Sequence, residues 1–149
     1  MSVSSATPLM IDTGALYARA DSDDTHHETA TDVFERIRSG GLPYRPLYTT
    51  QAVLAEAATL CRYKLGHDVA VRTLTAVRDS QSITVLPVEP DTFDAAATQF
   101  AAYDEQEISF VDHTTAVLAA DRDIDHVFAF DDDFRTLGFT VVPNDEVAP

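Results

Sequence analysis

Residues 126–143 read HVFAFDDDFRTLGFTVVP, and this stretch decides the class of fold. Two apolar runs, 126–131 and 139–143, have the length and the bounding residues of buried strands. The polar segment DDFRTLG between them predicts a short helix. A strand, a helix and a second strand in this order indicate that the two strands are parallel members of one sheet.

The rest of the chain repeats this alternation. Two further apolar runs, PLMID (8–12) and ITVLPV (83–88), predict strands. The segment LPYRPLYTT (42–50) predicts a loop that runs into a short extended piece. We therefore predict an α/β fold, a three-layer α/β/α sandwich with a central parallel sheet, formed by a single domain over residues 1–149. Helices are predicted at 13–21, 21–41, 50–66, 67–80, 89–107 and 108–125.

The composition is that of a folded globule with an unusual charge. Apolar residues make up 45% of the 149, which is enough to bury a core without disulfide or metal staples. Acidic residues number 25 against 10 basic ones, for a net charge of −15. One interpretation is a protein that avoids polyanions, because its field repels phosphate. We favour another, a habit of the whole proteome, since this Asp-rich and Lys-poor surface is similar to that of proteins from salt-loving archaea.

The sequence indicates neither a membrane segment nor thiol chemistry. The only uninterrupted apolar run near the N-terminus is LMI (9–11), which is too short for a signal peptide or a membrane span. Cys61 is the only cysteine and is predicted to be a small buried residue on a helix. We expect a cytoplasmic protein.

Acidic residues stand where two of the predicted strands end. Asp12 closes the first strand, and Asp131 closes the strand that begins at residue 126. In open parallel sheets, functional sites form outside the carboxyl ends of the strands. The alternative for each residue alone is a structural one, because an aspartate in this position can cap the helix that follows.

Two more acids occupy unexpected positions on predicted helices. Glu56 in VLAEAATL and Asp112 in ISFVDHTTAVLA both lie at the edge of an apolar stripe, although a solvated acid belongs on the opposite face. Burying an unpaired carboxylate is costly. The alternatives are an edge position whose side chain bends out to water, or a pair with an arginine.

Taken together, these four acids predict a metal site. Clustered carboxylates cannot all stay ionised without a counter-charge, and hard divalent cations such as Mg²⁺ and Mn²⁺ supply it with few protein ligands. Two such ions about 3.5–4 Å apart activate a water and stabilise both oxygens of a phosphoryl displacement. A metal would therefore explain why three aspartates in a row are tolerated at residues 131–133.

The order of these motifs resembles the PIN-domain family, and within it the VapC-type toxin ribonucleases. The motifs are IDTGALYA, VLAEAATL, ISFVDHTTAVLAA and FAFDDDF, and the resemblance covers about residues 9–142. It implies a three-layer α/β/α fold and cleavage of single-stranded RNA by water attack with Mg²⁺ or Mn²⁺. It also implies an RNA substrate, a possible cognate antitoxin protein and a homodimer.

The resemblance assigns a role to individual acids. It implies that Asp12, Glu56, Asp112 and Asp131 are the catalytic metal ligands, with Asp133 as an auxiliary ligand. Asp132 matches no functional position and is expected to be solvated.

Two positions depart from the family pattern, and neither of them removes a metal ligand. Gly14 stands where the family often has Ser or Asn, with Thr13 as a substitute hydroxyl, and Ala129 stands where a Thr is expected. Ser109 fits the small hydroxyl that the family often has three residues before Asp112.

Two other functions remain open on the sequence alone. A PIN-like RNA-processing or binding module with little or no nuclease activity is compatible with the two departures and the acidic surface. A phosphatase that forms an aspartyl-phosphate also begins with an aspartate at a strand end. It requires a second aspartate two residues on, where this chain has Gly14, so it ranks last.

Overall fold

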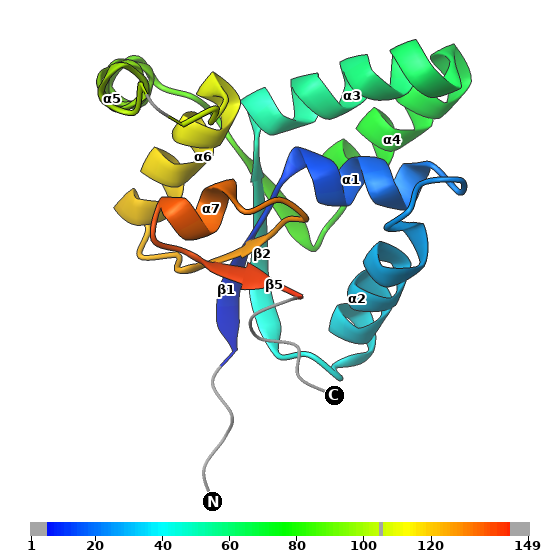
Figure 1. The fold of residues 1–149 in the computed structure, drawn as a ribbon. Helices are drawn as coiled ribbons and strands as arrows, with labels where there is room; N and C mark the ends of the chain where they lie inside the picture. The colour runs from blue at the N-terminus through cyan, green and yellow to red at the C-terminus, as the bar shows by residue number, and fades with distance from the viewer. Residues whose placement is uncertain (1–5, 105, 144–149) are drawn as a thin grey trace, which may run out of the picture.

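The computed structural model describes residues 6–104 and 106–143. Its centre is a parallel sheet in which the described strands follow the order β3-β2-β1-β4-β5 (Figure 1). The strand order reverses at β1, which is where an α/β sheet places its site. The strands are β1 (Thr7–Ile11), β2 (Tyr44–Thr50), β3 (Ile83–Leu86), β4 (His126–Phe128) and β5 (Thr140–Val142).

Helices cover both faces of the sheet (Figure 1), which confirms the predicted three-layer arrangement. One face packs against α1, α2, α3 and α4, and the other against α6 and α7. Helix α5 packs on the outside of α6 rather than on the sheet. The helices are α1 (Thr13–Ala20), α2 (His27–Ser39), α3 (Gln51–Leu65), α4 (His67–Asp79), α5 (Pro90–Ala102), α6 (Phe110–Asp121) and α7 (Asp133–Thr136).

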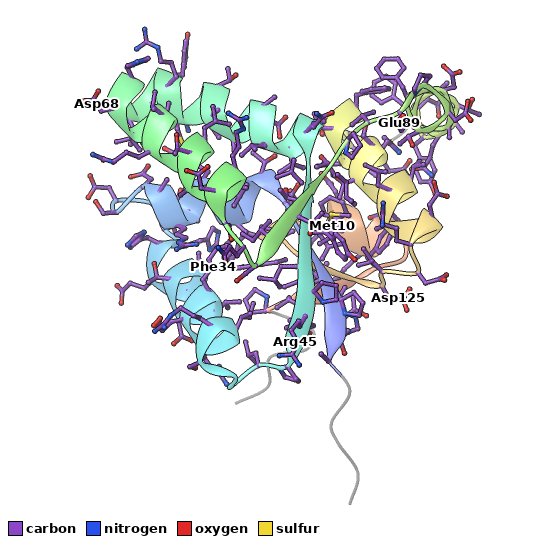
Figure 2. The ribbon with its side chains drawn as sticks, turned by 180° about the vertical axis from the view of Figure 1, so that it is seen from behind. Met10, Phe34, Arg45, Asp68, Glu89 and Asp125 are labelled. Atoms are coloured by element: carbon purple, nitrogen blue, oxygen red, sulfur yellow. The ribbon has the colours of Figure 1, made fainter. Side chains whose placement is uncertain are left out.

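The two apolar cores follow from the pleat of the strands. Alternate side chains of β1 point to opposite faces, so Leu9 and Ile11 join the core beneath α1 to α4 while Met10 joins the core beneath α6 and α7. Figure 2 shows Met10 and Phe34 of α2 on opposite sides of the sheet. Because β1 is buried on both faces, its sequence is a continuous apolar run.

Strand β2 corrects the prediction of a loop with a short extended piece at residues 42–50. It pairs with both β1 and β3, so it lies inside the sheet. Pro46 made this segment look unlike a central strand, because proline cannot donate to the ladder. The pairing with β1 shifts register between Thr7 and Leu9, opposite Tyr44 and Leu47, and the irregularity accommodates the exposed proline.

Several predicted boundaries also move. Helix α5 ends at Ala102 rather than at residue 107, α6 ends at Asp121 rather than at residue 125, and β3 ends at Leu86 rather than at residue 88. Helix α2 begins at His27 rather than at Asp21, because the carboxylates of Asp21 and Asp24 accept N–H groups two residues ahead and favour a turn. Strand β4 ends at Phe128, so Asp131 lies three residues beyond the strand rather than at its end. In the described part of the chain, we find no helix that is both long enough and apolar enough to cross a membrane.

Candidate metal centre

The sheet brings the acidic residues to one edge. Strands β1 and β4 are neighbours, and Asp12 N donates to Phe128 O over 3.0 Å directly beyond their last pair. Asp12 therefore lies beside the loop that carries residues 131–133. The two strands that these acids follow are neighbours, although Asp131 lies in a loop beyond β4 rather than at the strand end as predicted.

A compact group of carboxylates forms next to Asp12. One oxygen each of Asp112, Asp131 and Asp133 lies within 4.8 Å of the others. Asp112 comes from the first turn of α6 and Asp133 from the first residue of α7. The Asp133 N–H donates to Asp131 Oδ1 over 3.1 Å, which fixes the orientation of the Asp131 carboxylate. Three oxygen donors at this spacing can reach a common cation.

Asp12 forms the buried wall of this group. Asp12 is only 3% exposed. Burial raises the pKa of Asp12 well above the ordinary value, and the charges of Asp112 and Asp131 raise it further. Nearby N–H groups of Thr13 and Gly14 offset part of this rise. Asp12 occupies the position before α1 but makes no capping hydrogen bond, and its Oδ1 has no partner among the described residues. The structural alternative of a helix cap is therefore not observed.

The pKa of Asp112 is also strongly raised. Burial, followed by the charges of Asp131 and Asp133, raises the pKa of Asp112 to about 7, against a small opposing effect of the Ser109 hydroxyl. The pKa of Asp131 is raised as well, by burial and by Asp133. The charges that act most strongly on Asp12, Asp112 and Asp131 are those of neighbouring carboxylates. Among the described residues, no basic side chain ranks with them as a compensating charge.

Glu56 lies at the rim. It is half-buried on α3, and its charge raises the pKa of Asp112, but it does not belong to the group within 4.8 Å. Asp132 is exposed and pairs with Arg135, as expected for a solvated residue. The structure thus brings Asp12, Asp112, Asp131 and Asp133 together and places Glu56 beside them.

The chemistry of this arrangement suits a hard divalent cation. All the donors are carboxylate oxygens, which is the ligand type preferred by Mg²⁺ and Mn²⁺. Asp12 Oδ1 and the neighbouring hydroxyl, Thr13 Oγ1, are both buried without a described partner, and such groups normally have one. A cation with its waters would satisfy the carboxylate oxygen and offset the mutual repulsion of the acids.

The sequence did not reveal one supporting residue. Thr49 is fully buried in β2, and its hydroxyl donates to the carbonyl of Ile11 over 2.9 Å. This bond ties the end of β2 to the residue before Asp12. The two threonines that end LPYRPLYTT could have indicated this residue. They were not considered, because the segment was predicted to be a loop that runs into a short extended piece.

The two departures from the family pattern, Gly14 and Ala129, place no side-chain hydroxyl at their positions. A Cβ added at Gly14 would meet only Asp12 Oδ2, at 3.9 Å, so a serine there would have room. Ala129 is fully buried between the strand and α7, where it supplies no hydroxyl.

Ser109 caps the helix that presents Asp112. Its Oγ accepts the Asp112 N–H over 3.1 Å. We expect Ser109→Ala to lower the free energy of unfolding by about 1 kcal/mol, because one N–H at the start of α6 loses its acceptor. Chemical denaturation measures this effect. Ser109→Thr is the matched control and keeps the acceptor, so equal losses in both variants would show that the cap contributes nothing.

Comparison with known proteins places this chain in a family. The family model described as "PIN domain" matches residues 9–140. The chain is 32% identical over 134 residues to "23S rRNA-specific endonuclease VapC20" of Mycobacterium tuberculosis, covering 90% of this chain and 97% of that protein.

Solved structures agree with this match. The crystal structure of Mycobacterium tuberculosis VapC20, described as a sarcin-ricin loop cleaving toxin, superposes with a TM-score of 0.78 and 31% identity over 88% of this chain and 95% of the other. VapBC2 from Rickettsia felis, bound to a promoter DNA fragment, shares the fold with a TM-score of 0.66 and 10% identity over 91% and 97% of the two chains. The acid cluster at the reversal point of a parallel sheet and the matches over nine-tenths of the chain show that it belongs to the PIN-domain family, as a VapC-type toxin endonuclease.

Proposed function

We propose that the chain is a Mg²⁺- or Mn²⁺-dependent endoribonuclease that cleaves single-stranded RNA by attack of water on a phosphodiester bond. The observation that carries the proposal is the carboxylate group within 4.8 Å beside the buried, unpartnered oxygen of Asp12. Such a cluster is destabilising unless a cation occupies it. The family match supplies the reaction class.

The acids have different roles in this proposal. Asp12, Asp112, Asp131 and Asp133 hold the metal, with Asp12 on the buried side. Glu56 orients the attacking water, because it lies outside the close group and its charge still acts on Asp112. A divalent cation bound there supplies Lewis-acid stabilisation of the charge that develops on the phosphate.

The substrate class follows from the relatives. VapC20 is described as specific for 23S rRNA and as cleaving the sarcin-ricin loop. We propose a loop of ribosomal RNA as the substrate of this chain, and the cytoplasm as its place of action. A net charge of −15 opposes the approach of RNA, so affinity depends on the divalent cation and on screening salt.

Two protein partners belong to the proposal. The first is a cognate antitoxin, which the match to VapC-type toxins implies. FitAcB from Neisseria gonorrhoeae is another structural relative, with a TM-score of 0.62 and 16% identity, and supports the fold alone. The second partner is another copy of this chain.

We expect RNA cleavage to require a divalent cation. A ribosomal RNA fragment that contains the sarcin-ricin loop, a scrambled hairpin and an unstructured RNA are incubated with Mn²⁺, with Mg²⁺ or with chelator, at low and at molar salt. Cleavage with metal and none with chelator is the expected result. Millimolar Mn²⁺ should also raise the melting temperature, since an ion that binds only the folded state stabilises it by mass action.

The same experiment separates the nuclease from a binding module. Metal that raises the melting temperature without cleavage of any RNA would favour the binding module. No shift in melting temperature across the Mn²⁺ titration would contradict a metal site altogether.

A further inference from the structure

Two aromatic rings stack beside the loop that carries the acid group. His26 and Phe130 lie with their ring centroids 4.3 Å apart and an angle of 6° between the ring planes. Phe130 lies between β4 and Asp131, and His26 immediately precedes α2. His26 is exposed, so one face of its ring covers Phe130 and the other faces solvent. The pair thus presents a flat aromatic surface next to a residue of the candidate metal centre.

The chain on both sides of His26 holds this residue in position. The His26 N–H donates to Asp24 Oδ2 over 2.9 Å, and the His26 carbonyl accepts the Ala30 N–H over 2.9 Å. The next residue, His27, places Nδ1 2.8 Å from the carbonyl oxygen of Ala18, which joins the start of α2 to the last turn of α1. A group that is fixed before a ligand arrives loses little conformational entropy on binding.

Phe130 belongs to a row of rings that continues into the core. It meets Phe128 edge-on, with centroids 5.8 Å apart, and Phe128 lies against Phe34 of α2 with centroids 5.0 Å apart. Phe34 and Phe128 are buried, and Phe130 packs against the same core. Core packing therefore accounts for these three phenylalanines.

Core packing does not account for the histidine that ends the row. His26 occupies the cap position before α2, where Ser, Thr, Asp or Asn is preferred, and its side chain makes no capping hydrogen bond. Its ring is exposed rather than buried. Neither capping nor burial of its own ring explains a histidine at this position.

The stack and two of the acids lie on opposite sides of the candidate metal centre. Phe130 packs on the core beneath α1 to α4, whereas Asp112 and Asp133 come from α6 and α7 over the other face of the sheet. Asp131 immediately follows Phe130, and consecutive Cα atoms are about 3.8 Å apart. A phosphate at the metal centre would therefore have a neighbouring base within reach of the stack.

We propose that the outer face of His26 stacks on a nucleobase next to the scissile phosphate, which makes His26 a substrate-binding residue that positions the RNA strand. The proposal rests on the RNA cleavage proposed above and adds a contact that no metal ligand provides. Stacking on a flat ring accepts any base, because every base has a π-face. We therefore expect a binding contact without strong sequence preference.

The charge of the chain favours a contact of this kind. With 25 acidic residues against 10 basic ones, the field of the protein opposes the approach of phosphates. High salt also weakens contacts between basic side chains and phosphates. Stacking of a base on an aromatic ring requires no opposite charge on the protein, so it is suited to holding RNA on an acidic surface.

A fluorescent reporter on the stack tests the contact directly. The chain contains no tryptophan, so His26→Trp introduces a single indole. This variant is mixed with a short single-stranded RNA of mixed sequence at saturating Mn²⁺, and stopped flow records its emission before cleavage, while the anisotropy of a labelled RNA reports binding. We expect the RNA to quench the emission, and a sugar–phosphate chain of equal length without bases to leave it unchanged. His67→Trp is the matched control, because His67 is exposed at the start of α4, and its emission should not change.

Removing the ring should weaken RNA binding rather than the chemical step. We expect His26→Ala to raise KM about tenfold and to leave kcat nearly unchanged, since a lost base stack weakens binding of the substrate and of the transition state equally. His26→Tyr keeps a flat ring and should restore KM. An abasic nucleotide, scanned along the RNA, should raise the wild-type KM by the same factor at one position. It should have no further effect there in His26→Ala, because both changes delete the same contact.

The proposal is overturned if bound RNA leaves the His26→Trp emission unchanged, or if the chain without bases quenches it equally. An unchanged KM in His26→Ala, or a KM in His26→Tyr as high as that of His26→Ala, would also overturn it. Gel analysis of the same samples reports cleavage separately. Quenching by an RNA that the wild type never cleaves would leave the stacking contact standing and contradict the nuclease, whereas cleavage without quenching would do the reverse.

Discussion

Replacing Asp12 by Asn is expected to lower metal-dependent RNA cleavage by at least about a hundredfold, since changing even an outer partner of a metal ligand typically costs about 10–100-fold. The metal-free variant should also melt at a higher temperature than the wild type. The reason is that Asp12 is buried beside Asp112 and Asp131, with one oxygen unpartnered, and the amide removes that uncompensated charge. Loss of activity with a gain in stability is typical of a functional carboxylate.

The measurement is initial cleavage rate at saturating Mn²⁺, with thermal unfolding in chelator. Asp132→Asn is the matched control, because it removes a charge from the same acidic run where the side chain is exposed and paired with Arg135. The control should keep wild-type cleavage. Wild-type cleavage by the Asp12→Asn protein would end the assignment of this residue as a metal ligand.

The metal-free protein is expected to lose stability as the pH rises from about 4 to about 8. Burial and the neighbouring carboxylates raise the pKa of Asp112 from its ordinary value of 3.8 to about 7 in the folded chain. Below pH 4 the carboxyl is protonated in both the folded and the unfolded state. Between these values the folded state retains a proton that the unfolded state releases, so the free energy of unfolding falls. The shift corresponds to up to about 4 kcal/mol, or roughly 10 °C in melting temperature.

Thermal unfolding in chelator across this pH range measures the effect. Asp112→Asn removes the titrating group and should flatten the dependence. Saturating Mn²⁺ should flatten or reverse it in the wild type, because metal binding favours the ionised carboxylate. A wild-type protein whose stability rises with pH in chelator would contradict the proposed repulsion between Asp112 and its neighbouring carboxylates.

The positions of three acids could be predicted from the sequence because local pattern and sheet geometry agree. Asp12 follows an apolar run that is buried on both faces, and Asp112 stands on an apolar helix edge beside a serine cap. Asp131 follows a strand that neighbours β1. Pattern alone did not separate the proposed metal role of these acids from helix capping, and at Asp12 the structure argues against capping, since its side chain forms no cap hydrogen bond.

Features that depend on pairing between distant segments could not be predicted. The sequence of β2 contains a proline and therefore favours a loop. It forms a strand because β1 and β3 pair with it, and the register shift accommodates Pro46. Asp133 was expected as an auxiliary ligand, and its place in the group within 4.8 Å depends on the turn at Asp131. Glu56 was predicted to be one of the metal ligands and lies at the rim of the group.

The interpretation of the acidic surface as halophilic stays a prediction.

Crystals soaked in Mn²⁺, with anomalous scattering recorded at the manganese edge, give the most direct test of the metal centre. We expect an anomalous peak about 2.0–2.2 Å from carboxylate oxygens of at least two of Asp112, Asp131 and Asp133, next to the buried oxygen of Asp12. The same soak of the Asp12→Asn protein should show a weaker peak or none. A wild-type crystal with no peak at this position at saturating Mn²⁺, or with manganese bound only elsewhere, would contradict it.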